Sequence, residues 1–417
     1  MRAEITRHAL DRVPLSLIVD DSTALVNLNY FFMRDRNLAD GQNRRWEDVP
    51  VVHPEWFTRQ FGEWCLGAGV RGKFSMVPCP AALGRIDQGL PLFSQVQLAS
   101  WLAMCREVIA PAFDFTPEMI THTYVVDLDT FQPLETRIWE QYHWHTLPVD
   151  REDLIHRYIA TACRILENVG LRPAGVTSPG GFGSRTRAFY ARVAGEAVRE
   201  VTGAATPYFF QRIDAQGRVN DYVWEQDPAA GTAVGEVVAC TDDRTGSWTG
   251  YGTVDADYYL TADLAGGRLA EVIDNGDPCI LCSHWQGFYG LHAGDGRGFA
   301  ALRTVVDRLR QRDPLGEHTR WRTCSEIATY TVAQAMATWQ VDGDTVMLDL
   351  PVQPKELTVR LTTGAEPRGV TVDGQPLRRA ASRAQFESGT YLAEDGAVLA
   401  ALDPAGRTVR VRVITGA

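Results

Sequence analysis

The sequence lacks the features that mark several classes of protein. It has 41 Lys and Arg against 52 Asp and Glu, a formal net charge of −11, so it has no excess of positive charge for binding nucleic acid or an anionic membrane. It contains no run of about 18 apolar residues, and its N-terminal segment has no apolar signal core. We therefore expect a cytoplasmic protein that binds neither nucleic acid nor membrane. The sequence leaves its oligomeric state open, and a homo-oligomer is compatible with it.

Several motifs of catalysis and cofactor binding are also missing. The chain has no G-x-G-x-x-G or G-K-[ST] pattern, no nucleophile elbow, and no Ser-His-Asp set supported by spacing. Cys279 and Cys282 form a C-x-x-C without the second pair that a zinc ribbon needs. We interpret the cysteines as small buried residues rather than metal ligands.

What is present is an alternation of apolar runs and helical patterns over about the first 330 residues. The predicted strands are 15–20, 72–79, 119–126, 173–181, 206–210, 235–241 and 277–285, and the predicted helices are 55–69, 94–111, 150–170, 184–203 and 296–313. This order favours parallel strands with crossover helices, in a (β/α) barrel or a doubly wound sheet.

The pattern of apolar and polar residues changes after about residue 335. Apolar and polar residues alternate there and are interrupted by D-G and A-G turns, which predicts a small antiparallel β-sandwich. We therefore divide the chain into an α/β domain, 1–332, and an accessory all-β domain, 333–417.

Polar residues gather where the predicted strands end. Asp20 and Asp21 close the run LIVDD, His122 and Ser178 follow two further strands, and His284 ends another. The carboxyl ends of parallel strands meet at one mouth, and that mouth carries the chemistry of barrel enzymes. This clustering predicts an enzyme.

The histidines point to a metal. His143 and His145 are two residues apart, so in an extended segment both rings lie on one side. Imidazole and carboxylate groups are suitable ligands for Zn²⁺, which in catalytic sites takes three protein ligands and keeps one position for water.

The order of these segments resembles the polysaccharide deacetylase family, metal-dependent carbohydrate esterases on a distorted (β/α) barrel of seven or eight strands. The family's T-F-D-D is matched by LIVDD (17–21), its G-V-x-A-T-F-F strand by GVRGKFSMV (69–77), and its histidine motif in part by HTY (122–124). Its last two motifs are approximated by GVTSPGGFG (175–183) and ILCSH (280–284). The similarity extends from residue 12 to about 315.

The resemblance implies a metal-dependent hydrolase that removes an acyl group from an N-acylated sugar or related amide. Asp21, His122 and His145 would hold a divalent metal, with Zn²⁺ favoured; His143 is the alternative third ligand. Asp20 would act as general base and His284 as general acid. The remaining candidates, for binding a carbohydrate or other small molecule, are His143, Trp144, Ser178, Arg185 and Trp285.

Two departures from the family pattern leave alternatives open. Val126 stands where the family has its second histidine, and Thr177 stands where it has an arginine that orients the base, although Arg185 is close in sequence. One alternative is a metal-free barrel glycoside hydrolase pairing Asp20 or Asp21 with Asp255, Asp257 or Glu140. Another is a non-catalytic carbohydrate-binding protein on the same scaffold.

Overall fold

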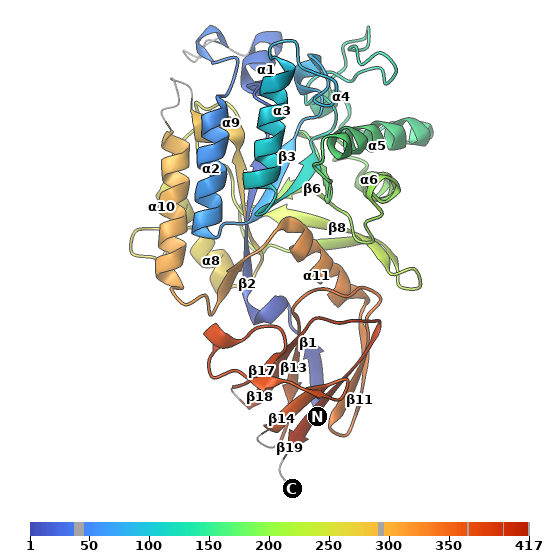
Figure 1. Ribbon diagram of the computed structural model, residues 1–417, viewed down its shortest axis with the longest axis vertical. Coiled ribbons are helices and arrows are strands. Elements are labelled where there is room, and N and C mark those ends of the chain that lie inside the picture. Colours follow the sequence, from blue (N-terminus) through green and yellow to red (C-terminus); the bar gives the residue numbers. More distant parts are fainter. Residues whose placement is uncertain (37–45, 291–295, 365–366, 395, 416–417) are drawn as a thin grey trace.

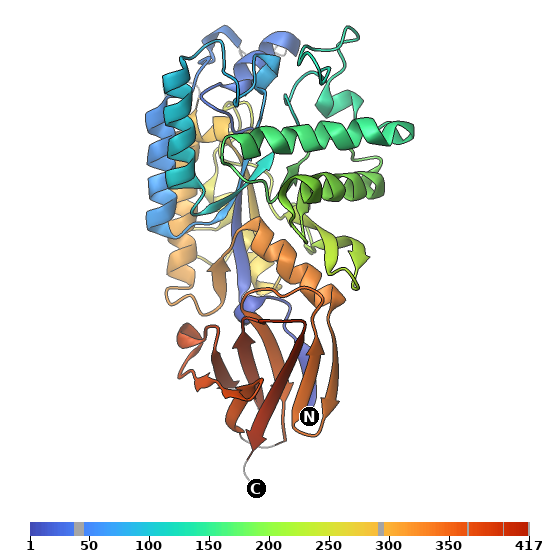
Figure 2. The ribbon, with the colours of Figure 1, turned by 45° about the vertical axis from the view of Figure 1, so that its right-hand side comes forward.

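The protein is a mixed α/β molecule with several sheets (Figure 1). The computed structural model describes residues 1–36, 46–290, 296–364, 367–394 and 396–415. An α/β part with helices around its strands lies above an all-β part, and helix α11 leads from the first into the second (Figure 2).

The first sheet is built around strand β2 and is parallel throughout. β2 pairs with β3, β9 and β10, and β3 pairs with β4. Its strands are β2 (Val13–Asp20), β3 (Gly72–Met76), β4 (Phe113–Pro117), β9 (Cys279–His284) and β10 (Thr319–Trp321). Every residue of β2 is buried, as a strand covered on both faces requires. Gly72 permits the close approach of β3, because a Cβ there would lie 1.9 Å from the carbonyl oxygen of Leu17.

The second sheet of the α/β part has the order β5-β6-β8-β7, in which only β7 is antiparallel to its neighbour. Its strands are β5 (Gly175–Thr177), β6 (Tyr208–Ile213), β7 (Tyr222–Asp227) and β8 (Thr232–Ala239). A single bridge between Phe115 and Pro173 joins it to the first sheet, and Cys240 N–H donates to the Ile280 carbonyl at the other side. In the described ranges, continuous strand pairing therefore does not close a barrel.

Helices surround these strands. They are α1 (Leu28–Arg36), α2 (Glu55–Ala68), α3 (Gln95–Met104), α4 (Glu140–His143), α5 (Glu152–Asn168), α6 (Arg187–Thr202), α7 (Ala256–Tyr259), α8 (Arg268–Asp274), α9 (Trp285–Tyr289), α10 (Arg297–Arg312) and α11 (Cys324–Met336). In Figure 1, α2, α3 and α10 stand together, and α5 and α6 lie at the other side. Within the described ranges, no helix combines the length and the apolar character that crossing a membrane requires.

One local prediction was wrong. The segment 119–126 is not a strand: β4 ends at Pro117, and the chain then turns, with positive φ at Met119 and His122. Its apolar residues Met119, Ile120, Val125 and Val126 are instead buried in an apolar cluster.

The all-β part consists of two five-stranded sheets with a shared apolar core. One sheet contains β1 (Arg2–Ile5), β13 (Leu357–Thr362), β16 (Arg378–Arg379), β17 (Thr390–Glu394) and β18 (Ala397–Leu402), and the other contains β11 (Thr338–Asp342), β12 (Thr345–Asp349), β14 (Pro367–Val372), β15 (Gln375–Pro376) and β19 (Thr408–Thr415).

The first strand of the chain lies in this all-β part. β1 is antiparallel to β13, with Ala3 opposite Leu361. The predicted division of the chain put these residues with the α/β domain, but they belong to the sheet formed by the other end of the chain.

Candidate active site

The carboxyl ends of the parallel strands converge on one pocket of about 260 Å³. Five of the predicted site residues line it: Asp20, Asp21, His122, Ser178 and His284. Asp20 ends β2, His284 ends β9, and the two are register partners in adjacent strands. Residues distant in sequence are therefore brought together by strand pairing, as the sequence predicted for a parallel α/β protein.

Adjacent aspartates reach the same pocket because the backbone turns between them. Successive side chains of a strand point to opposite faces, but Asp21 has φ of 57°. This left-handed conformation is uncommon for a residue other than glycine, and asparagine and aspartate adopt it more readily than most residues. The turn directs both carboxylates toward the pocket.

A buried lysine is paired with Asp20. Lys73, on β3, is fully buried; its Nζ donates to Asp20 Oδ1, to Ser75 Oγ at 2.8 Å and to Thr177 Oγ1 at 2.7 Å. Ser75 Oγ also donates to Asp20 Oδ1, at 2.8 Å. Burial raises the pKa of Asp20 although the charge of Lys73 opposes the rise. Both hydrogen bonds to this carboxylate from the described residues go to Oδ1.

Asp21, Glu118 and His122 form a compact group of possible metal ligands, with one donor atom of each within 4.8 Å of the others. His122 Nε2 lies 2.6 Å from Asp21 Oδ1 and 3.2 Å from Glu118 Oε1. Despite burial, these carboxylates raise the pKa of His122 well above its usual value, and His122 lowers that of Asp21. Two carboxylates and an imidazole are suitable ligands for a divalent metal ion. The donor set therefore fits a metal ion.

The loop carrying these ligands is held by a buried acid. Glu140, at the start of α4, accepts hydrogen bonds from the backbone N–H groups of Ile120, Thr121 and His122 at 2.7–3.2 Å, and from the hydroxyl of Tyr158 at 2.5 Å. Burial raises the pKa of Glu140 to about 7 although these donors favour the carboxylate. Glu140 therefore fixes the turn that presents His122.

His284 is oriented by a carboxylate that the sequence reasoning missed. Its Nδ1 lies 2.7 Å from Oδ2 of Asp243, in the loop after β8. Burial lowers the pKa of His284, but the hydrogen bond to Asp243 and the charge of Asp21 outweigh it and raise the pKa to about 9. This pKa favours the protonated imidazole at neutral pH, and the described residues make no hydrogen bond to its Nε2.

The prediction that His145 completes the metal site is corrected, because Glu118 is the third residue of the group. His145 packs against Gly181: a Cβ added at Gly181 would lie 2.3 Å from Nε2 of His145. His143 is exposed, and its Nδ1 accepts the backbone N–H of Trp139 at 2.8 Å. Neither histidine lines the pocket.

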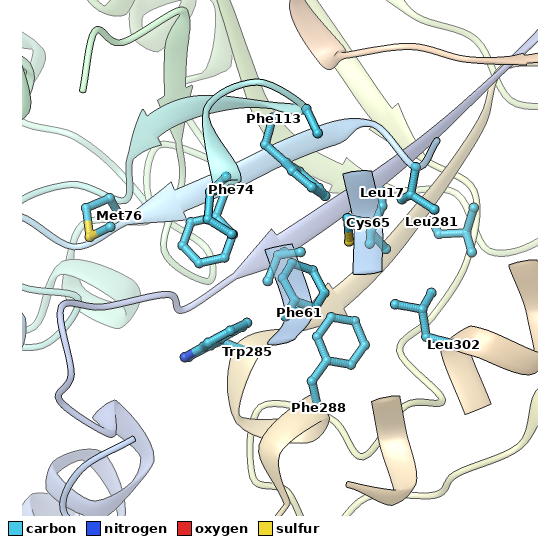
Figure 3. Packing of buried hydrophobic residues seen from close by; sticks show 14 of the residues in the cluster. Leu17, Phe61, Cys65, Phe74, Met76, Phe113, Leu281, Trp285, Phe288 and Leu302 are labelled. Carbon is cyan, nitrogen blue, oxygen red and sulfur yellow. The ribbon is translucent and has the colours of Figure 1, made fainter. Parts of the chain in front are cut away.

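Three predicted substrate-binding residues also lie elsewhere. Trp285 is fully buried and packs with Phe61, Phe74 and Phe57, so it belongs to the core (Figure 3). Trp144 is buried against Tyr158 and Phe182. Arg185 is exposed and does not line the pocket. The sequence could not distinguish a core aromatic from one at the pocket wall.

Lys73, Glu118 and Asp243 are the functional candidates that the sequence reasoning missed. A signal was present for Lys73, the one charged residue of the predicted strand 72–79, and for Asp243, which comes shortly after the predicted strand 235–241. Glu118 was missed because the predicted strand began at residue 119, whereas β4 ends at Pro117 and Glu118 directly follows it.

The carboxylates proposed as partners of Asp20 or Asp21 in a metal-free glycosidase do not line the pocket. Asp255 caps α7, Asp257 pairs with Arg308, and Glu140 is occupied by the backbone of the 118–123 turn. None of the three lines the pocket of Asp20 and Asp21. The two-carboxylate arrangement predicted for that reaction is therefore not formed by these residues.

Comparisons with known proteins give only distant similarities. No protein-family model and no curated protein matches the sequence. Among solved structures, a candidate polysaccharide deacetylase from Mycobacterium smegmatis is 15% identical, with 82% of this chain and 99% of that one covered and a TM-score of 0.41. A probable polysaccharide deacetylase from Pseudomonas aeruginosa PAO1 is 14% identical, with 76% and 90% covered and a TM-score of 0.39. An Anoxybacillus alpha-amylase is 9% identical, with 98% and 100% covered and a TM-score of 0.31. At these TM-scores the similarities assign no activity to this chain.

Proposed function

We propose that the protein is a metal-dependent hydrolase that removes an acyl group from an N-acylated sugar or a related amide, on a distorted (β/α) barrel. One observation carries the proposal: a buried carboxylate held by a lysine, a protonated histidine held by an aspartate, and an Asp-Glu-His group share one pocket. Base, acid and metal ligands are the three parts that such hydrolysis needs.

Asp21, Glu118 and His122 would hold the metal ion. A divalent ion such as Zn²⁺ supplies Lewis acidity toward an acyl carbonyl and lowers the pKa of a bound water. Asp20 would take a proton from the attacking water. Because its Oδ1 is held by Lys73 and Ser75, Oδ2 is the oxygen available for that proton.

His284 would complete the reaction as the acid. Water adds to the acyl carbon, the C–N bond breaks, and the amine nitrogen leaves with the proton of His284 Nε2. The hydrogen bond from Nδ1 to Asp243 fixes the ring and favours the protonated form that this role requires. The products are a carboxylic acid and a free amine.

Lys73 and Glu118 can replace the two family residues that this sequence lacks, the arginine and the second histidine. Lys73 supplies a cation to the base from β3, and it hydrogen-bonds to Thr177, the residue at the arginine position of the resemblance. Glu118 supplies a third ligand in place of the missing histidine. These replacements support a catalytically active protein in which a lysine takes the place of the arginine and a glutamate that of the second histidine.

The pocket wall suits a sugar. Asn29 Oδ1 and Gln286 Oε1 are buried and accept no hydrogen bond from the described residues, so they can accept from substrate hydroxyl or N–H groups. Phe32 and Trp248, whose ring centroids lie 4.9 Å apart, add an aromatic surface for the apolar face of a sugar ring.

The test is elemental analysis of protein purified without added metal, together with release of acetate from N-acetylated sugars. We expect bound metal in the wild type, loss of metal and of activity in Asp21→Ala, and retention of metal with loss of activity in His284→Ala. Full metal retention in Asp21→Ala would falsify the ligand assignment. Chelator-resistant release of reducing sugar would favour a glycosidase instead.

A further inference from the structure

A second cavity, of about 220 Å³, lies at the opposite end of β2 from Asp20. Arg12, the residue before β2, lines it together with Arg322, Lys355 and the α11 residues Ile327 and Tyr330. Lys355 precedes β13, so the cavity is formed jointly by the α/β part and the all-β part. It shares no lining residue with the candidate active site.

Arg12 is a buried charge that makes no ion pair with the described residues, although Asp313 and Glu356 act on it at longer range. Its side chain is 3% exposed, its Nε has no hydrogen-bond partner, and its Nη2 donates to the backbone carbonyl of Arg383. Among the described residues, no carboxylate lies within ion-pair distance of this guanidinium. Burying an unpaired charge is costly, so such a group normally has a partner.

The neighbours of Arg12 increase the positive charge. Arg322, 8% exposed, is paired with Glu356, but its Nη2 is buried and unpartnered. Arg320 also forms an ion pair with Glu356, so one carboxylate is shared by two guanidinium groups. Burial and the charges of Arg320 and Arg322 lower the pKa of Arg12, although Asp313 and Glu356 oppose this decrease. This cluster is positive in a chain whose net charge is −11.

The acid at the cavity wall is already engaged. Glu326 accepts the backbone N–H of Thr323 at 2.9 Å, closing the cap of α11, and lies 3.3 Å from Arg71. Lys355 is exposed, and the described residues give it no ion pair. It is one of only two lysines in the sequence, the other being the buried Lys73.

We propose that this cavity binds a phosphate-type oxyanion, either as the free ion or as the phosphate group of a small organic molecule. Arg12 and Arg322 would face the anion from within, and Lys355 would close on it from the surface. Guanidinium groups are suited to oxyanions by geometry and charge. Ile327, Tyr330 and Pro354 add an apolar wall on which an organic group can pack.

The test uses the full chain with inorganic phosphate and with phenyl phosphate, each against chloride at equal ionic strength. We expect saturable binding by calorimetry and a rise of several degrees in the melting temperature. Tighter binding of phenyl phosphate identifies an organic ester as the ligand, and equal binding identifies the free ion. Absence of saturable binding of both probes at millimolar concentration overturns the proposal.

Variants and selective labelling locate the site. Lys355→Ala, a surface change, should weaken phosphate binding by about tenfold, as expected for loss of one charge-assisted contact. Arg12→Met should abolish the phosphate-dependent rise in melting temperature. If this variant does not fold, the phosphate affinity of Lys355→Ala tests the site instead. Arg378→Ala, which removes an exposed cation on β16, is the control.

Selective labelling is a second test. Lys73 is buried, so acylation with an amine-reactive ester should modify Lys355 and be slowed by phosphate. Unchanged affinity in Lys355→Ala with no protection of Lys355 places any bound phosphate elsewhere and rejects this site.

Discussion

At the scale of single residues, the chemistry depends on how one buried carboxylate is held. Asp20 is close to fully buried, and an isolated carboxylate there would be neutral at most pH values. Lys73 and Ser75 both bind Oδ1, which favours the ionised form and fixes the direction of the other oxygen. We infer that Lys73 is a positioning residue, because it acts on the reaction only through Asp20.

Replacing this lysine should affect turnover more than substrate binding. In Lys73→Met, Asp20 loses its charged partner, so we expect kcat to fall by about 100-fold or more, the range for a general base. KM and metal content should stay close to wild type, since Asp21, Glu118 and His122 make no contact with Lys73. The measurement is steady-state kinetics beside elemental analysis.

Lys73→Arg is the conservative control. It keeps the charge and the donors, so it should recover part of kcat, limited by the larger guanidinium in a fully buried place. Loss of a buried pair partner costs about 3–5 kcal/mol of stability, so folding of each variant is checked by circular dichroism. A folded Lys73→Met with wild-type kcat would contradict the role given to Asp20.

At the scale of elements, the short helix α9 packs its aromatic side chains around a buried histidine. His53 is 2% exposed, and the described residues offer neither of its ring nitrogens a hydrogen bond. Its ring centroid lies 5.0 Å from that of Tyr289 and 6.1 Å from that of Trp285. Burial lowers the pKa of His53 to about 3, so the imidazole is neutral in the folded protein over most of the pH range.

This histidine makes stability depend on pH with a defined sign. Its pKa is lower in the folded than in the unfolded chain, so the stabilisation is complete above about pH 6.5 and is lost as pH falls toward 3. Between pH 7 and 5 we expect the free energy of unfolding of the wild type to fall by about 2 kcal/mol more than that of His53→Phe. Denaturant unfolding at both pH values measures this, and parallel decreases in the two proteins would show that His53 is not responsible.

Prediction of the elements succeeded where the local pattern is strong. The run at 15–20 became β2, and helices 55–69, 150–170, 184–203 and 296–313 became α2, α5, α6 and α10 within a few residues. It failed at 119–126, where β-branched and aromatic residues resemble a strand but the chain turns, because Glu140 binds three successive backbone N–H groups there. No local pattern reports a partner that lies some 20 residues further along the chain.

At the scale of the whole molecule, the two ends of the chain share one sheet. β1 lies at the edge of its sheet and covers β13, and Ala3 and Ile5 contribute to the core of the all-β part. Tyr330 of α11 donates to the carbonyl of Thr6, so β1 is also linked to the helix that joins the parts.

Deleting residues 1–6 should therefore damage the end of the protein that is distant in sequence. The deletion exposes the edge of β13 and removes two core side chains, so we expect a lower melting temperature and association through the open edge. The point variant Ile5→Ala keeps the strand and should cost about 2–5 kcal/mol without association. Thermal melts and light scattering distinguish these outcomes, and a monodisperse deletion variant with wild-type stability would rule out this role for β1.

The sequence by itself determined the alternation of strands and helices, the change to an antiparallel β pattern near residue 335, and the polar residues at strand ends. These are local properties, set by periodicity and by the residue types at the end of an apolar run. It therefore identified Asp20, Asp21, His122, Ser178 and His284, which do meet in one pocket.

Only the tertiary structure decided which partners complete the site and which aromatic residues face it. Lys73 is more than 50 residues from Asp20, and Asp243 is about 40 from His284. Trp285 is adjacent to a site histidine yet packs in the core, and β1 pairs with a strand from the far end of the chain. Such pairings depend on strand register, turns and burial, which arise from contacts between segments that no local pattern contains.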